Sequence, residues 1–117
     1  MLEILDKLNT HPGVMGCLVA TTDGIVVASR LTSGLDEDAA AALASSLLTN
    51  TIGLLRNCGD PHLERLVLRA TRGKIIVFDL GNAYLVVVTD QHLNLEHGLI
   101  EIQSAAKQLS RMGQIKV

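Results

Sequence analysis

The segment that most constrains the fold is DAAAALASSLLTNTIGLLRNCG, residues 38–59, whose composition favours one long helix. At about 100° per residue, its polar positions occupy an arc of about 120°, and apolar or small side chains fill about 200° of the rest. One contact with a protein core needs about half of that remaining arc. The segment therefore predicts a helix with two apolar stripes, only one of which a small domain covers by itself. The polar positions are Ser46, Thr49, Asn50, Gly53, Arg56 and Asn57.

The chain has 117 residues, 48% of them hydrophobic, which is enough for one domain over residues 1–117 and too little for two. Its net charge of -2 gives no general reason to bind nucleic acid or an acidic membrane surface. Glu3 and Asp6 interrupt the first apolar positions, so the start does not read as a signal peptide. No apolar run approaches the roughly 20 residues of a membrane span, and we expect a cytoplasmic protein.

Hydrophobic periodicity predicts a helix, two strands, the long helix, three strands and a final helix. The first helix stops before Pro12, the first two strands join at the turn Asp23-Gly24, and the last helix starts near Asn94. Short connections between strands make most of the sheet antiparallel, and an α+β layered domain is the simplest way to bury it. The expected strands cover residues 14–20, 25–30, 65–71, 74–80 and 83–89.

Three stretches in this order resemble the Roadblock/LC7 domain family over essentially the whole chain. They are VATTDGIVVAS (19–29), DEDAAAALASSLL (36–48) and YLVVVTDQHLNLEHGLIEIQSAAKQL (84–109). In the last stretch Asp90, Asn94 and Leu95 match the family's loop before the final helix. Glu96 stands where the family has Gly, and the nearest glycine is Gly98.

The resemblance implies a five-stranded antiparallel sheet with the long central helix on one face and the two terminal helices on the other, a profilin-like layering. It also implies homodimers or heterodimers that pair their central helices and third strands. Bacterial and archaeal members are similar to partners and regulators of small Ras-like GTPases, and some promote GTP hydrolysis. Eukaryotic relatives serve as dynein light chains and signalling scaffolds.

The apolar arc of the long helix and the family resemblance both predict that a second copy of the chain packs against this helix. We assign the sheet-facing stripe to Leu43, Leu47, Leu54 and Cys58. We assign the outward, dimer-forming stripe to Ala41, Ser45, Leu48, Ile52 and Leu55. Leaving the three large side chains of the outward stripe exposed would forgo about 5 kcal/mol per protomer. The alternatives are that the chain's own terminal helices cover this stripe, or that part of it stays exposed.

The strand over residues 65–71 alternates apolar residues with a mostly basic face. Arg65, Val67 and Arg69 lie on that second face, and we include them in the dimer interface because the resemblance pairs third strands. The alternatives are a surface for an acidic partner, a face that is simply solvated, or a device against edge-to-edge aggregation.

The polar positions of the long helix, Ser46 to Asn57 as given above, form the predicted contact surface for a small Ras-like GTPase. Any acceleration of GTP hydrolysis would come from positioning the GTPase's own groups, with Arg56 as the candidate for an arginine supplied in trans. The alternative is a structural adaptor dimer that touches no GTPase.

The sequence carries no constellation that indicates catalysis, a metal or a cofactor. His92 and His97 lack a third ligand at a useful spacing, and Asp79 and Asp90 have no nearby nucleophile, so we expect them in turns and caps. No Gly-rich phosphate cradle with Gly-Lys-Ser or Gly-Lys-Thr occurs. We therefore predict a non-enzymatic protein without a cofactor or small-molecule substrate. The two cysteines, Cys17 and Cys58, are expected to be buried free thiols.

Overall fold

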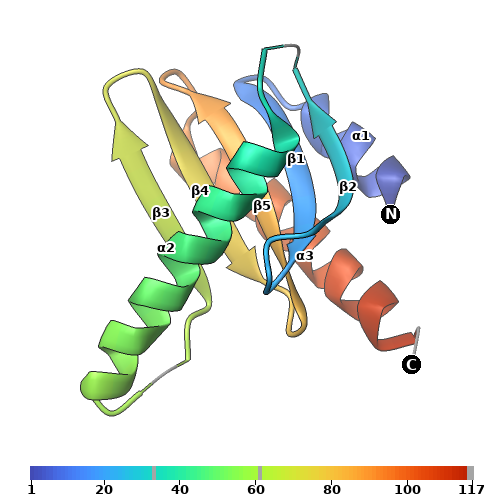
Figure 1. Ribbon diagram of the computed structural model, residues 1–117. Coiled ribbons are helices and arrows are strands. Elements are labelled where there is room, and N and C mark those ends of the chain that lie inside the picture. The colour runs from blue at the N-terminus through green and yellow to red at the C-terminus, as the bar shows by residue number, and fades with distance from the viewer. Residues whose placement is uncertain (33, 61, 116–117) are drawn as a thin grey trace.

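The described part of the chain folds into three helices and five strands in the order that the sequence predicts (Figure 1). This computed structural model describes residues 1–32, 34–60 and 62–115. The elements are α1 (Leu2–Asn9), β1 (Val14–Thr21), β2 (Val26–Leu31), α2 (Glu37–Asn57), β3 (Arg65–Ala70), β4 (Gly73–Asp79), β5 (Ala83–Asp90) and α3 (Leu95–Ile115).

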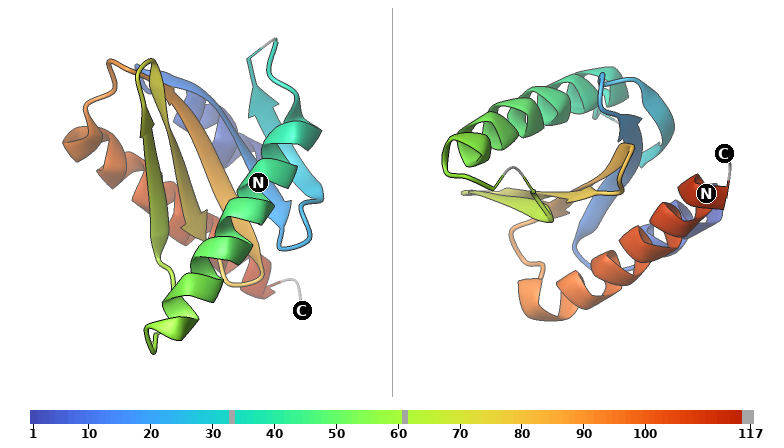
Figure 2. Two further views of the ribbon diagram at one scale, coloured as in Figure 1. Left: turned by 60° about the vertical axis from the view of Figure 1, so that its left-hand side comes forward. Right: turned by 90° about the horizontal axis from the view of Figure 1, so that it is seen from below.

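The five strands form one antiparallel sheet in the order β2-β1-β5-β4-β3. The strands β2 and β3 are therefore its two edges. The helix α2 crosses one face diagonally, from the β1 and β2 side past the lower end of β3, while α1 and α3 cover the other face (Figures 1 and 2). The predicted α+β layering, with the central helix alone on its face, is confirmed.

Alternation along the strands divides the core between the two faces of the sheet. Leu18 points toward α2, whereas its neighbours Cys17 and Val19 point toward α1 and α3. The core on the α1 and α3 side is the larger of the two, because two helices bury the sheet there. On the other side α2 contributes only three fully buried residues, Ala41, Ala44 and Leu48.

Local contacts explain where α2 begins and ends. The Asp36 carboxylate accepts hydrogen bonds from the backbone N–H groups of Asp38 (3.0 Å) and Ala39 (3.3 Å), which caps the first turn. After the last turn, Gly59 takes a φ of +94°, a left-handed conformation that glycine adopts without steric cost. The sequence indicates both signals, and the observed bounds lie within two residues of the predicted segment.

The predicted assignment of the two α2 stripes is wrong. Ala41 and Leu48, assigned to the dimer, are buried against the chain's own sheet, whereas Leu43 and Leu54, assigned to the sheet, are 65% and 68% exposed. The small residues Ala41 and Ala44 let the helix approach the sheet closely, so they serve a helix–sheet contact rather than a helix–helix contact. The Ser45 hydroxyl, also assigned to the dimer, donates to the Thr22 carbonyl oxygen at 2.8 Å.

The remaining positions of the two stripes are intermediate or exposed. Ile52 and Leu55 of the predicted outward stripe, and Leu47 of the predicted sheet-facing stripe, are half-buried. Cys58 is exposed rather than buried, because α2 has already left the sheet at its C-terminal end (Figure 2). Cys17 is buried as predicted.

Among the described helices, α2 alone has the length and mean hydropathy of a membrane span, a test that core helices of soluble proteins also pass. Only 17% of its apolar window is buried. Since one side packs on the sheet through Ala41 and Leu48, the helix belongs to a globular layer. Its low burial indicates that much of its apolar surface is left for another contact.

Candidate functional site: an uncovered apolar surface and a polar platform

One flank of α2 carries an uncovered apolar stripe. Leu43 and Leu54 are exposed and Leu47 is half-buried. At about 100° per residue these three side chains fall within an arc of about 40° on the helix. We call Leu43, Leu47 and Leu54 the α2 stripe. Burying either exposed leucine would stabilise the folded protein by about 1.5 to 3 kcal/mol.

A second uncovered apolar region lies on the same side of the sheet, where the diagonal path of α2 does not reach. Leu68 pairs with Ile75, and Ile75 pairs with Val88, so all three point to the face that Val77 also occupies. Together with Met15 they line a shallow hollow of about 350 Å³. We call Met15, Leu68, Ile75 and Val88 the sheet hollow. Met15, Leu68 and Ile75 are each more than a third exposed.

The α2 stripe and the sheet hollow make one side of the molecule unusually apolar for a protein surface. Scattered exposed hydrophobic residues need no explanation, but several that share one face indicate a contact with another molecule. Sequence reasoning did not place this surface. The alternation of Leu66, Leu68 and Ala70 gives the apolar face of β3, but only the crossing direction of α2 decides how much of that face is covered.

The six polar residues predicted to bind a partner are all exposed on α2. We call this set the polar platform: Ser46, Thr49, Asn50, Gly53, Arg56 and Asn57. The Thr49 hydroxyl donates to the Ser45 carbonyl oxygen at 2.9 Å, so this side chain is partly engaged with its own helix. Arg56 forms no ion pair within the described part of the chain, and its guanidinium is free to contact another protein.

The basic face of β3 points away from α2. Val67, which shares that face, packs against the core on the α1 and α3 side, while Arg65 and Arg69 are exposed. Because β3 is an edge strand, its backbone N–H and C=O groups on the outer side have no strand partner within the chain. Arg65 and Arg69 therefore flank a free sheet edge rather than the apolar surface.

The carboxylates considered as a catalytic pair lie at opposite ends of the sheet. Asp79 ends β4, and its carboxylate accepts from the Gly81 N–H at 2.8 Å. Asp90 ends the antiparallel neighbour β5, and its carboxylate accepts from the N–H groups of His92 (2.8 Å) and Leu93 (3.0 Å). Both side chains hold turns, as predicted.

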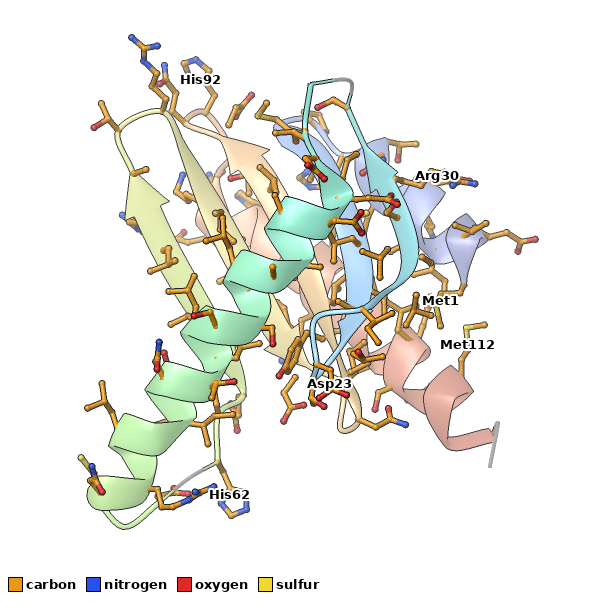
Figure 3. The ribbon with its side chains drawn as sticks, viewed as in Figure 1. Met1, Asp23, Arg30, His62, His92 and Met112 are labelled. Carbon is orange, nitrogen blue, oxygen red and sulfur yellow. The ribbon has the colours of Figure 1, made fainter. Side chains whose placement is uncertain are left out.

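The histidines are also dispersed. His92 lies at one end of the sheet and His62 beyond the far end of α2 (Figure 3). Within residues 1–32, 34–60 and 62–115, no three His, Cys, Asp or Glu side chains come together as metal ligands would. The structural features that stand out are thus surfaces for protein contact rather than a pocket with reactive groups.

Comparison with known proteins agrees with this architecture. The sequence pattern of the Roadblock/LC7 domain matches residues 1–89. An uncharacterised protein of Methanocaldococcus jannaschii, MJ1340, is 31% identical over 110 residues, which cover 94% of this chain and 96% of that protein.

Two solved structures share the fold over nearly the whole chain. One is described as MglB with a tetrameric arrangement; it has a TM-score of 0.89 and 23% identity, covering 99% of this chain and 89% of the other. The other is a Roadblock/LC7 domain from Streptomyces avermitilis, with a TM-score of 0.89 and 18% identity, covering 97% and 98% of the two chains.

Proposed function

Because the chain belongs to the Roadblock/LC7 domain family, we propose that it works as a homodimer that binds a small Ras-like GTPase and modulates its nucleotide cycle. The family and the MglB-like structures support a regulator-type role related to GTPase systems. Domains of this family are regulatory or adaptor domains rather than enzymes. We place the protein in the cytoplasm, where such a GTPase is found.

The observation that carries this proposal is the uncovered apolar surface of the α2 stripe and the sheet hollow. A second copy of the chain is a suitable occupant, because a two-fold interface joins one patch to the same patch on the partner. In such a dimer each α2 stripe covers apolar surface of the partner, and the free edges of β3 lie close together. Ala41 and Leu48 have no part in this interface, since the chain's own sheet already buries them.

Two neighbouring α2 helices would join their polar platforms into one continuous surface for the GTPase. The chain has no phosphate cradle of its own, so its contribution is to orient groups of the bound GTPase. Arg56 is the residue of the platform that can place a cation near transferring phosphate from outside, because its guanidinium is exposed. Arginine donors fit phosphate oxygens well.

The oligomeric state tests the first half of the proposal. We would measure the solution mass by light scattering for the wild type, for Leu43→Glu/Leu54→Glu and for the control Ile100→Glu. Ile100 on α3 is 67% exposed, as much as the two leucines, but it lies on the opposite side of the sheet. We expect a dimeric wild type, a folded monomeric double variant and a dimeric control. A monomeric wild type, or a double variant that stays dimeric, would remove this interface.

Nucleotide turnover tests the second half. The probe is a purified small Ras-like GTPase from the same organism, loaded with GTP and followed in single turnover with and without this protein. We expect a change in the hydrolysis or exchange rate that Arg56→Ala reduces and that the monomeric variant abolishes. Dimers that neither bind this GTPase nor change its rates would favour the adaptor role.

A further inference from the structure

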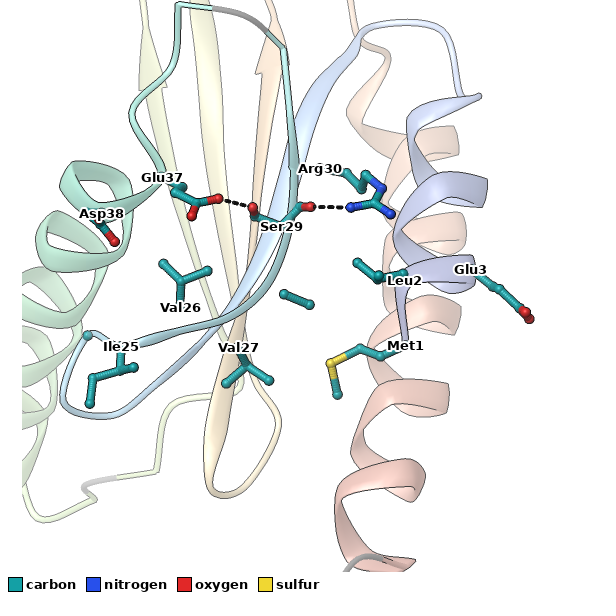
Figure 4. A pocket seen from close by; sticks show the side chains of 12 residues that line it. Met1, Leu2, Glu3, Ile25, Val26, Val27, Ser29, Arg30, Glu37 and Asp38 are labelled. Atoms are coloured by element: carbon teal, nitrogen blue, oxygen red, sulfur yellow. Dashed lines mark hydrogen bonds between the residues drawn. The ribbon is translucent and has the colours of Figure 1, made fainter.

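A groove runs along β2, at the edge of the sheet opposite to β3. Its floor is the strand, and its walls are the start of α1 on one side and the start of α2 on the other (Figure 4). The groove has a volume of about 1050 Å³. Because β2 is an edge strand, one side of its backbone has no strand partner in the chain. We call this feature the β2 groove.

The edge strand of the β2 groove carries exposed apolar side chains, whereas natural proteins commonly protect sheet edges from pairing with other strands. Ala20 pairs with Val26 and Val19 pairs with Ala28, so Val27 forms a bulge without a partner on β1. The side chain of Val27 is 51% exposed, and that of Ile25 beside it is 64% exposed. Charged side chains usually shield such an edge, and a bulge also discourages pairing with another strand. Here the bulge itself and the residue beside it carry exposed aliphatic side chains in place of charged ones.

The walls of the β2 groove differ in chemistry. On the α2 side stand the carboxylates of Glu37 and Asp38, and on the α1 side stand the apolar Met1 and Leu2 (Figure 4). The Glu37 carboxylate accepts a hydrogen bond from the Ser29 hydroxyl, which fixes it at the rim of the groove.

The cation in the lining is already engaged. The Arg30 Nε donates to the Asp6 carboxylate at 2.9 Å, and its Nη1 donates to the Ser29 carbonyl oxygen at 3.0 Å. On the α2 wall, Glu37 and Asp38 form no ion pair within the described part of the chain. This wall therefore carries negative charge that a cationic occupant would complement.

We propose that the β2 groove binds an extended basic peptide segment of a partner protein, which adds to the sheet as a strand beside β2. An added strand has two faces, one toward the α2 wall and one toward the α1 wall. A segment that alternates Lys or Arg with Val or Ile would place its cations near Glu37 and Asp38 and its apolar side chains near Leu2 and Val27. The backbone hydrogen bonds supply affinity, and the two walls supply specificity.

A second copy of the chain fits the β2 groove poorly. Pairing two β2 edges would bring the carboxylates at the starts of both α2 helices near one another, and like charges at short distance repel. Pairing β2 with the basic β3 edge of another copy would be head-to-tail and would lead to an open chain of subunits. The inference uses the edge opposite to the proposed dimer, so it stands or fails independently of the GTPase proposal.

The test is a titration of the ¹⁵N-labelled full chain with acetyl-Val-Lys-Val-Lys-Val-Lys-Val-amide, followed by amide chemical shifts. We expect saturable shifts concentrated in residues 25–31 and at the starts of α1 and α2. A control peptide with proline in place of the valine at its third position keeps the charge but loses a backbone donor, and it should not saturate.

Matched variants separate the groove from general electrostatic attraction. Glu37→Gln/Asp38→Asn should weaken peptide binding about fivefold, since two exposed ion pairs are worth about 1 kcal/mol together. Glu96→Gln/Glu101→Gln removes the same charge from exposed positions on α3 and should leave the affinity unchanged.

Three results would overturn the inference. They are the absence of saturable shifts, equal binding of the proline peptide, and shifts centred on β3 or the α2 stripe. Self-association of the wild type beyond a dimer that Val27→Lys reverses would instead assign the groove to a second copy. None of these outcomes bears on the proposed homodimer, which the light-scattering experiment tests separately.

Discussion

At the scale of single residues, Gly16 and Gly53 differ in the space that a side chain would find. A methyl group at Gly16 would lie 2.8 Å from the Leu31 Cα and 3.0 Å from the Arg30 carbonyl oxygen, which are backbone atoms of β2. A methyl group at Gly53 would meet no described atom within 4 Å, and the residue lies inside a helix. We expect Gly16→Ala to lower the free energy of unfolding by about 1 to 3 kcal/mol, and Gly53→Ala to raise it by about 0.5 to 1 kcal/mol. Urea denaturation measures both, and a neutral Gly16→Ala would contradict the close approach of β1 and β2.

Cys17 makes the stability of the protein depend on pH. Burial, followed by the nearby Asp6 carboxylate, raises the pKa of its thiol from 9.0 to about 12. The unfolded chain therefore loses this proton first, so the raised pKa leaves stability unchanged below pH 9 and lowers it as the pH rises from 9 to 12. The expected slope is about 1.4 kcal/mol per pH unit.

Denaturation midpoints across this pH range measure the Cys17 effect. Cys17→Ala should be less stable at pH 7 because of the cavity, yet its stability should fall less steeply above pH 9. In the native wild type at pH 8, a thiol reagent should label the exposed Cys58 alone. Equal labelling of both cysteines would show that the Cys17 site opens readily.

At the scale of elements, the start of α2 depends on one side chain. Asp36 satisfies two backbone N–H groups that the helix itself leaves without partners. Asp36→Ala should lower the free energy of unfolding by about 1 kcal/mol, while Asp36→Asn, which keeps an acceptor oxygen, should stay close to the wild type. Chemical denaturation of the three proteins tests this, and an equal loss in both variants would mean that the carboxylate acts through charge rather than as a cap.

The helix α2 also shows which structural features can be predicted from the sequence alone. Strand alternation and turn residues such as Gly24 gave the order of elements, because a period of two or 3.6 is a local property of the chain. Which side of α2 meets the sheet is not local. Ala41 and Ala44 suit close approach to either a sheet or a second helix, and the leucines are spread over both stripes. The residues of the polar platform are exposed, because polar side chains avoid burial on either choice, and their contact with a partner stays a prediction.

At the scale of the whole molecule, the uncovered apolar side predicts a stability that depends on protein concentration. If two copies bury the α2 stripe and the sheet hollow together, unfolding separates them, and mass action then favours the folded dimer at higher concentration. A tenfold increase should add about 1.4 kcal/mol per dimer and raise Tm by about 3 to 5 °C. Leu43→Glu/Leu54→Glu should show a lower Tm that does not change with concentration.

Calorimetric scans at three concentrations over a hundredfold range measure this dependence. Ile100→Glu serves as the control, because it places a glutamate at a comparably exposed position on the opposite face and should keep the wild-type dependence. A wild-type Tm that is constant over this range would mean that each chain is stable with its apolar side in water. The homodimer would then be withdrawn, and any GTPase complex would contain a single copy of this chain or a different protein in place of the second copy.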